Sequence, residues 1–354
     1  MQVLHTPINS PRWQLLRQYT LVRVNSMDGI DLALFDFDRH NALYYFALSS
    51  DENIYFRYGG RDSEAADTYL NLESLALALK QGLKLDEAKN KKALSDILRP
   101  QPKFPHQVPG LNEHVVQQER CVECHHIAHF ETTEAEKNKT LNKLSDMFRS
   151  PDIKNLGIFL DIPKGLQVRT ARGVAKDAGL KEGDLITKIN STRLITFGDF
   201  QYHLDKVDRK AKAISLSVER RGIELEFSIV LPNAWWATDI SYRHWTIEPR
   251  IFFQSKSLTN AEKKLLELPL DGLAAQVTEV PLDAMLESAH ELKLGDVITA
   301  VNGKKKNPLG VGSKLHIQLY HRAGETVTLD IIRDGKELKL PLHTKRQFFR
   351  RVED

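Results

Sequence analysis

The chain has 354 residues but only two cysteines, no long apolar run and almost no excess of either charge. Two cysteines as close together as Cys121 and Cys124 exclude a disulfide framework and leave a metal, haem or redox site. No stretch approaches the roughly 18 consecutive apolar residues that a membrane-spanning helix needs. With 50 basic and 47 acidic residues, the composition gives no argument for binding nucleic acid, which requires a concentrated basic face.

Signals for export and for catalysis are missing as well. Residues 1–23 contain no apolar segment of the kind found in secretion signals, which predicts a cytoplasmic protein as the sequence is printed. A start upstream of Met1 would instead place the protein in the periplasm or envelope. The sequence contains neither a Gly-x-Ser-x-Gly nucleophile turn nor a phosphate-binding loop, so the prediction leans away from an enzyme.

An internal repeat is the most informative feature that is present. Gly183–Asn190 recurs as Gly295–Asn302 at an offset of 112, and Val218–Gly222 recurs as Ile331–Gly335. In each copy a short apolar strand follows Gly-Asp, then come a helical spacing of apolar residues and two alternating segments joined by a turn. Each copy is therefore predicted to be a small, partly open β-barrel with one or two helices.

The rest of the chain divides by composition, and the whole is predicted to be an α+β multidomain protein. Residues 1–85 show strand patterns at 21–24, 31–35, 43–48 and 54–58 and a helix at 72–79. Residues 86–150 form a polar connector with a helix near 134–148, and Thr259 is predicted to cap a short helix over Glu262. The predicted division is 1–85, connector 86–150, first repeat 151–232, aromatic linker 233–262 and second repeat 263–345.

The repeats resemble bacterial PDZ domains. The resemblance rests on Leu156–Leu160, Ala178–Asp184 and Ile189–Asn190, with Leu294–Asp296 and Asn302–Gly303 in the second copy. It implies a glycine-containing loop whose backbone N–H groups hold a peptide's C-terminal carboxylate, with the peptide added as a strand. The implied peptide-binding residues are Leu156, Gly157 and Ile158 in the loop, Phe159 and Leu160 on the edge strand, and Phe200 and Leu204 on the helix. In the second copy Asp271 beside Gly272 would repel a carboxylate, so weak or no binding is expected there.

Nearly the whole chain resembles a bacterial family that joins a thioredoxin-like region, a CxxCH segment and two PDZ domains, and that includes selenoproteins. The matching residues are Phe35–Asp38, Asn53–Tyr55, Arg57–Asp62, Cys121–His125 and Leu258–Lys263. No well-defined activity comes with the family. The sequence departs from a working thioredoxin because no cysteine pair precedes Cys121 and no proline lies just before the segment 43–48. Either the redox site is lost, or it lies upstream of Met1.

The Cys-x-x-Cys-His motif leaves three chemistries open. Haem c attachment would use Cys121 and Cys124 as thioethers and His125 as the axial ligand, with Met147, His129 or His126 opposite. Zinc would take both cysteines and two of the three histidines. A reactive dithiol is the third. A separate carboxylate pair, Asp36 and Asp38, is predicted either to hold a cation or to mark a strand end.

Two functions follow from these features. The first is a non-enzymatic envelope adaptor that binds protein or peptide C-termini through the first PDZ domain. The second is an electron-transfer protein based on haem c or thiols, which its PDZ domains deliver to partners. Neither involves nucleic acid.

Overall fold

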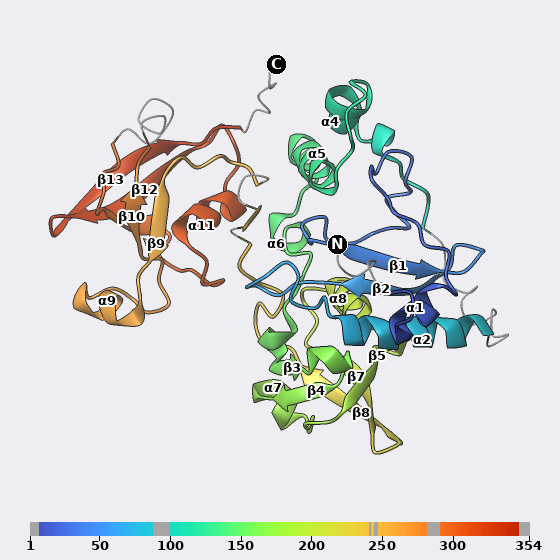
Figure 1. Ribbon diagram of the computed structural model, residues 1–354. Coiled ribbons are helices and arrows are strands. Elements are labelled where there is room, and N and C mark those ends of the chain that lie inside the picture. Colours follow the sequence, from blue (N-terminus) through green and yellow to red (C-terminus); the bar gives the residue numbers. More distant parts are fainter. Residues whose placement is uncertain (1–6, 88–99, 241, 244–246, 282–290, 347–354) are drawn as a thin grey trace. The chain divides into compact units, whose positions relative to one another are not determined.

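The computed structural model describes residues 7–87, 100–240, 242–243, 247–281 and 291–346 (Figure 1). The chain forms two compact units. The first combines residues 1–134 with 148–238, and the second combines 135–147 with 239–354. Several separate sheets and helices make up these units, and no sheet among the described residues closes into a barrel. Each unit is described by itself.

The N-terminal part of the first unit is a hairpin with two helices. Strands β1 (Tyr44–Leu48) and β2 (Ile54–Gly59) pair antiparallel, and their buried side chains pack with α1 (Pro11–Leu16) and α2 (Leu72–Glu87). The predicted helix at 72–79 is confirmed, and it continues through Gly82 to Glu87. The described residues of 7–87 form this two-stranded sheet and no larger one, so the thioredoxin-like fold stays a prediction.

Two predicted strands are wrong. Residues 21–24 lie outside any sheet, and Val22 is 79% exposed, so no buried face selects an extended pairing there. Residues 31–35 form a turn, because the Asp31 carboxylate accepts hydrogen bonds from the backbone N–H groups of Ala33 and Leu34. A side chain that bonds its own following backbone offers an alternative to the strand ladder.

The connector is more helical than predicted. It contains the short turns η1 (Pro105–Gln107), α4 (Pro109–Leu111) and η2 (Asn112–Val116), followed by α5 (Cys124–Lys137) and α6 (Lys143–Asp146). The helix expected near 134–148 thus begins ten residues earlier, at the second cysteine. Buried aliphatic side chains of this region form a core of their own with Met27 and Leu32.

The α6 segment belongs to the second unit because of one buried cation. The Lys143 ammonium donates to the carbonyl oxygens of Glu248, Gln318 and His321 at 2.6, 2.8 and 2.8 Å and lies 3.5 Å from the Glu136 carboxylate. Burial lowers the pKa of Lys143, and the nearby Glu136 carboxylate counteracts that effect. These contacts tie residues 135–147 to the second PDZ-like repeat.

The first repeat contains two small sheets. One pairs β3 (Ile158–Leu160) with β4 (Val168–Ala171), and the other has the order β6-β5-β7-β8. Its elements are η3 (Ile153–Leu156), β3, η4 (Ile162–Lys164), β4, α7 (Gly173–Asp177), β5 (Leu185–Ile189), β6 (Thr192–Arg193), α8 (Phe197–Asp205), β7 (Ala213–Arg220) and β8 (Ile223–Val230). The predicted strand, helix and hairpin of this copy are confirmed.

The second repeat forms one five-stranded sheet of order β13-β12-β11-β10-β9. Its elements are β9 (Gln254–Ser257), α9 (Asn260–Leu265), β10 (Ala275–Glu279), β11 (Val297–Val301), α11 (Ser313–Tyr320), β12 (Thr326–Arg333) and β13 (Lys336–His343). The Thr259 cap over Glu262 is confirmed at the start of α9. The linker aromatics pack as predicted, since Trp235 and Phe253 are buried; Trp245 lies outside the described residues.

The repeated sequence motifs form the same ion pair in both copies. Arg220 holds both oxygens of Asp184 at 2.6 and 2.8 Å, and Arg333 holds both oxygens of Asp296 at 2.7 and 2.8 Å. Each carboxylate also accepts a backbone N–H at 2.8 Å, from Lys181 in the first copy and from the equivalent lysine in the second. Burial would raise the pKa of Asp184, but Arg220 holds it below its usual value. The repeat signature therefore joins the Gly-Asp turn to the end of the hairpin strand.

Replacing either arginine by methionine is expected to destabilise its own unit by about 3 kcal/mol, because a buried carboxylate loses its partner. Hydrogen exchange should rise in β5 and β7 for Arg220→Met and in β11 and β12 for Arg333→Met. Arg221→Met, one position along in an exposed turn, is the matched control and should change neither. Equal exchange in the Arg220 variant and the control would show that the pair has no structural role.

Candidate peptide-binding edge

The loop before β3 is shaped by the chain's own backbone. Asp152 caps the η3 turn by accepting from the Lys154 N–H, and the turn ends at Gly157 with φ of 75°. A Cβ atom at Gly157 would lie 1.9 Å from the carbonyl oxygen of Arg172. The glycine is therefore required by the close passage of the chain after β4, whatever ligand the loop takes. Its N–H donates to the Lys154 carbonyl at 2.9 Å.

Strand β3 has one edge paired and one edge open. The Arg172 N–H donates to the Gly157 carbonyl and the Asp161 N–H to the Gln167 carbonyl, both at 2.8 Å, while Phe159 faces Thr170. In an antiparallel ladder these bonded pairs alternate with positions whose N–H groups point away. The N–H groups of Ile158 and Leu160 therefore point to the edge opposite β4. Among the described residues, β4 is the one strand paired with β3.

Most side chains that the PDZ resemblance assigns to binding are buried. Leu156, Ile158, Leu160, Phe200 and Leu204 are between 0 and 5% exposed. Phe159 is half-buried, and the Arg172 guanidinium lies 5.0 Å from its ring centre. The accessible features of this edge are therefore its backbone, the Phe159 ring and the Arg172 charge. The binding roles of the seven residues stay predictions.

Helix α8, which carries Phe200 and Leu204, is tied to the N-terminal hairpin. The Tyr44 hydroxyl donates to the Gly198 carbonyl at 3.1 Å, and the Arg57 N–H donates to Asp199 at 2.8 Å. The Gln201 carboxamide accepts from the N–H of Arg61 and donates to its carbonyl, at 3.2 and 2.8 Å. Burial raises the pKa of Asp199 to about 6. Residues 44–61 therefore hold α8 in place.

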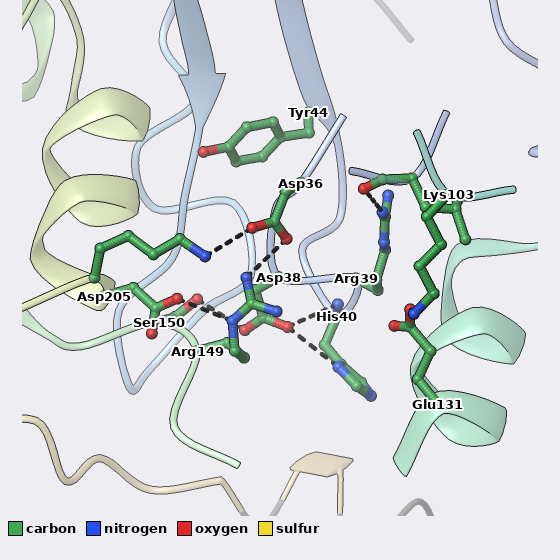
Figure 2. A network of polar contacts seen from close by, with 12 residues as sticks. Asp36, Asp38, Arg39, His40, Tyr44, Lys103, Glu131, Arg149, Ser150 and Asp205 are labelled. Carbon is green, nitrogen blue, oxygen red and sulfur yellow. Dashed lines mark hydrogen bonds and ion pairs between the residues drawn. The ribbon is translucent and has the colours of Figure 1, made fainter. Parts of the chain in front are cut away.

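The predicted carboxylate pair Asp36 and Asp38 lies in an ion-pair network rather than at a cation site (Figure 2). Asp36 accepts from Arg149 and Lys206, each at 2.8 Å, and Arg149 also reaches Asp205 at 2.9 Å. Burial alone would raise the pKa of Asp36, but Arg149 and Lys206 lower it well below its usual range. Asp38 accepts from the Ser150 hydroxyl at 2.7 Å and lies 3.2 Å from the His40 ring. The chain's own side chains thus occupy both carboxylates.

The second repeat has its loop at a different place from the predicted one. The Val168 N–H donates to the Asp184 carbonyl and the Val277 N–H donates to the Asp296 carbonyl, both at 2.8 Å. Val277 is therefore the counterpart of Val168, β10 the counterpart of β4, and β9 the counterpart of β3.

The segment equivalent to the glycine loop is consequently 250–253, which contains no glycine. Asp271–Leu273 lies between β9 and β10, so the interpretation of Asp271 as a charge beside a carboxylate loop was wrong. A hydrogen bond of 2.8 Å joins the hydroxyls of Ser255 on β9 and Ser313 on α11. This bond joins the first residue of α11 to strand β9, which is the outer strand of its sheet.

The α11 helix also contains a buried histidine. His316 is 4% exposed, and burial, with smaller contributions from His321 and Lys304, lowers its pKa to about 4. An unfolded chain would protonate this ring near pH 6.5, so the unfolded state binds more protons between pH 6.5 and pH 4. Stability contributed by the neutral ring is therefore complete above pH 6.5 and is lost as the pH falls towards 4.

Lowering the pH from 7 to 5 is expected to cost the second unit about 2 kcal/mol through His316. His316→Gln should remove that part of the pH dependence in urea unfolding measured at both pH values. His343→Gln changes an exposed histidine and serves as the control. The assignment would be contradicted if the free energy of unfolding of His316→Gln fell between pH 7 and pH 5 by as much as that of the unchanged protein.

The CxxCH motif lies at the start of α5. Cys121 is exposed, Cys124 is half-buried, and burial raises the pKa of the Cys124 thiol, which disfavours a reactive thiolate. His129, one turn further along α5, is 4% exposed, and burial lowers its pKa to about 4. Met147 is buried and belongs to the other unit.

A hydrophobic cluster lies on one side of the motif. Wholly buried side chains, Leu111 and Ile127 among them, pack beside α5, and Cys124 packs at the rim of this cluster. The haem and the cysteine-based zinc site stay predictions. The part of the chain that the structure describes contains no trio of ligand atoms within 4.8 Å that includes a cysteine. The trio that it does contain is Glu123, His125 and His126, of which Glu123 had not been predicted.

A cavity of about 730 Å³ lies elsewhere in the first unit. Its walls include Tyr69 and Leu77 from the N-terminal region and Lys164 and Arg193 from the first repeat. Its lining includes no residue of strand β3 or of the CxxCH motif. The candidate peptide edge is therefore a strand edge rather than a deep pocket.

Comparison with known proteins supports the interpretation of the repeats. No family model matches the chain. Over 178 residues it is 26% identical to a probable periplasmic serine endoprotease DegP-like from Marinomonas sp. (strain MWYL1), covering 47% of this chain and 34% of that protein. The resemblance of the repeats to PDZ domains stays a prediction from the sequence. It spans about a third of the length of the curated relative, so that protein's activity is not carried over here.

Two solved structures also match weakly. HtrA-type protease AlgW with a tripeptide is 17% identical with a TM-score of 0.22, covering 34% of this chain and 39% of that one. The same protease with a decapeptide is 16% identical with a TM-score of 0.23, covering 38% and 42%. Scores this low carry no argument about the arrangement of the chain. What the structure itself shows is two repeats with equivalent strands and the same Asp–Arg ion pair.

Proposed function

We propose that the chain is a peptide-binding protein in which the open edge of β3 takes a peptide C-terminus as an added strand. The observation that carries this proposal is the pair of outward N–H groups at Ile158 and Leu160, on an edge that starts at the left-handed Gly157. Strand addition supplies affinity through main-chain hydrogen bonds and specificity through alternate side chains. The buried groove residues leave Phe159 as the main side-chain contact.

Arg172 is proposed to supply the charge that a terminal carboxylate needs. The Gly157 N–H is already bonded to the Lys154 carbonyl, so one of the loop's donors is not available to a ligand. The exposed Arg172 side chain lies beside Phe159 at the same end of β3. A guanidinium can hold both oxygens of a carboxylate at once. Peptides with a free C-terminus should therefore bind more tightly than amidated ones.

The second repeat is proposed to be structural. Its strand β9 is bonded to α11 through Ser255 and Ser313, and the segment before it has no glycine. A peptide strand would have to break that bond before it could reach the edge. Binding is therefore assigned to the first repeat alone.

The protein is proposed to act as a non-enzymatic adaptor in the bacterial envelope. The support for the location is the description of the DegP-like relative as periplasmic. No helix among the described residues is long and apolar enough to cross a membrane. The adaptor role is proposed because the open edge of β3 offers main-chain groups for binding a peptide.

Fluorescence anisotropy with an array of labelled decapeptides tests the proposal. The peptides end in Leu, Ile, Val or Phe, each as a free acid and as an amide. At least one acid is expected to bind at least 10-fold more tightly than its amide, which corresponds to 1.4 kcal/mol. Arg172→Met should abolish that preference, whereas Arg169→Met, which changes an exposed arginine on the preceding strand β4, should keep it. Equal binding of acids and amides to the unchanged protein would contradict carboxylate recognition.

A further inference from the structure

Three metal-ligating side chains gather at the start of α5, and the peptide-binding proposal makes no use of them. Glu123, His125 and His126 offer ligand atoms that all lie within 4.8 Å of one another. Oxygen Oε2 of Glu123 is 3.3 Å from Nδ1 of His125, and the ring centres of His125 and His126 are 4.4 Å apart. We propose that this trio binds one borderline divalent transition-metal ion of the Zn²⁺ type.

The separations are close to those that such an ion requires. Ligand atoms about 2.1 Å from a tetrahedral zinc ion lie about 3.4 Å from one another. The Glu123–His125 separation already matches that value, and a small rotation of His126 brings its ring into range. Two imidazoles and one carboxylate leave a further coordination position open to water or another ligand. Imidazole nitrogens favour zinc, copper and nickel over magnesium or calcium.

The backbone under the trio is held while the side chains remain accessible. Val122 and Ile127, which flank the trio in sequence, are 1% and 0% exposed in the core of this region. The Glu123 and His125 side chains are 56% and 41% exposed, so an ion can reach them from solvent. This combination fixes the spacing of the three Cα atoms and leaves only side-chain rotation for binding.

The site differs from a zinc site built on the cysteines. Such a site would use Cys121 and Cys124 as thiolates, yet neither cysteine belongs to the described trio. The two possibilities predict opposite results for a variant without the two cysteines. A Glu/His site survives the loss of both thiols, and a Cys/His site does not.

Titration calorimetry of the full chain with ZnCl₂, with the thiols kept reduced, tests the proposal. One Zn²⁺ per chain is expected, and His125→Ala, His126→Ala and Glu123→Gln should each weaken binding at least 10-fold, since each removes one ligand of three. The double variant Cys121→Ser/Cys124→Ser should bind within 2-fold of the unchanged protein. His114→Ala is the matched control. His114 is also an exposed histidine beside a glutamate, 4.0 Å from Glu113, but it belongs to no trio of ligand atoms among the described residues.

The Co²⁺-loaded protein gives an independent readout of the ligands. A thiolate ligand produces a strong near-ultraviolet charge-transfer band, which should be absent here. Absence of Zn²⁺ binding, loss of binding in the cysteine variant or in His114→Ala, or a thiolate band with Co²⁺ would each overturn the proposal. Peptide binding is measured separately and does not depend on any of these outcomes.

Discussion

Gly157→Ala is expected to destabilise the first unit by about 3 kcal/mol and to abolish peptide binding. A Cβ atom at this position meets the Arg172 carbonyl at 1.9 Å, so the chain after β4 must move. An alanine at φ of 75° adds about 1 kcal/mol of backbone strain, and overpacking against fixed backbone costs a further 1 to 3 kcal/mol. The measurement is the free energy of unfolding in urea together with the peptide array.

Gly222→Ala is the matched control for that variant. Gly222 has φ of 79° in the two-residue turn between β7 and β8, close to the 75° of Gly157, but a Cβ atom there meets nothing within 4 Å. This variant should show the backbone strain of about 1 kcal/mol alone and should keep peptide binding. If the two variants lose the same stability, the close contact with Arg172 is not what the glycine serves.

Arg149→Met is expected to lower the free energy of unfolding of the first unit by about 2 to 3 kcal/mol. The guanidinium lies between the carboxylates of Asp36 and Asp205, at 2.8 and 2.9 Å (Figure 2). Its removal takes away one of the two cationic partners of each carboxylate and leaves Lys206 with Asp36 and Arg209 with Asp205. Burial would lower the pKa of Arg149, but these two carboxylates raise it above its usual value. Urea unfolding at pH 7 measures the effect.

Lys206→Met provides the comparison. Lys206 also pairs with Asp36 at 2.8 Å, but its side chain is 49% exposed, so its loss should cost less than about 1 kcal/mol. A double variant with Asp36→Asn should recover part of the Arg149 loss, because it removes one of the two carboxylates that have lost Arg149 as a partner. An Arg149 variant as stable as the Lys206 variant would show that the network does not hold this region together.

Local periodicity was sufficient to predict the elements of both repeats. The strand at 297–301, the helix near 311–321 and the hairpin after it all form, because alternation and helical spacing are properties of adjacent residues. The same reasoning failed at 21–24 and 31–35, where apolar residues occur without a partner strand or beside a competing aspartate. Propensity cannot show whether a second strand is available for pairing.

Features that depend on distant residues were beyond prediction. Asp36 and Arg149 are 113 positions apart, and no pattern in the sequence connects them. The loop of the second repeat was wrongly predicted at Asp271–Leu273, where a glycine occurs. The equivalent segment, 250–253, contains no glycine, and only the pairing of β9 with β10 identifies it. Glu123 was not predicted as a ligand, because the CxxCH motif contains only cysteine and histidine as ligand types. Its position two residues before His125 was a usable signal.

The two repeats therefore diverged at the feature that matters for binding. Both keep the Asp–Arg pair that joins the Gly-Asp turn to the hairpin, so both keep the fold. Only the first keeps a left-handed glycine before its edge strand. The second instead ties the corresponding strand to its helix. Under the proposed function, the first repeat is the binding domain and the second is a structural domain built from the same unit.

Amide hydrogen exchange at β3, with and without the tightest-binding peptide of the array, tests the central claim most directly. A peptide added as a strand should protect the N–H groups of Ile158 and Leu160, while the N–H of Phe159, which already faces Thr170, should not change. Protection at Ser255 and Ser257 on β9 instead, or no protection at Ile158 and Leu160 under saturating peptide, would contradict the account.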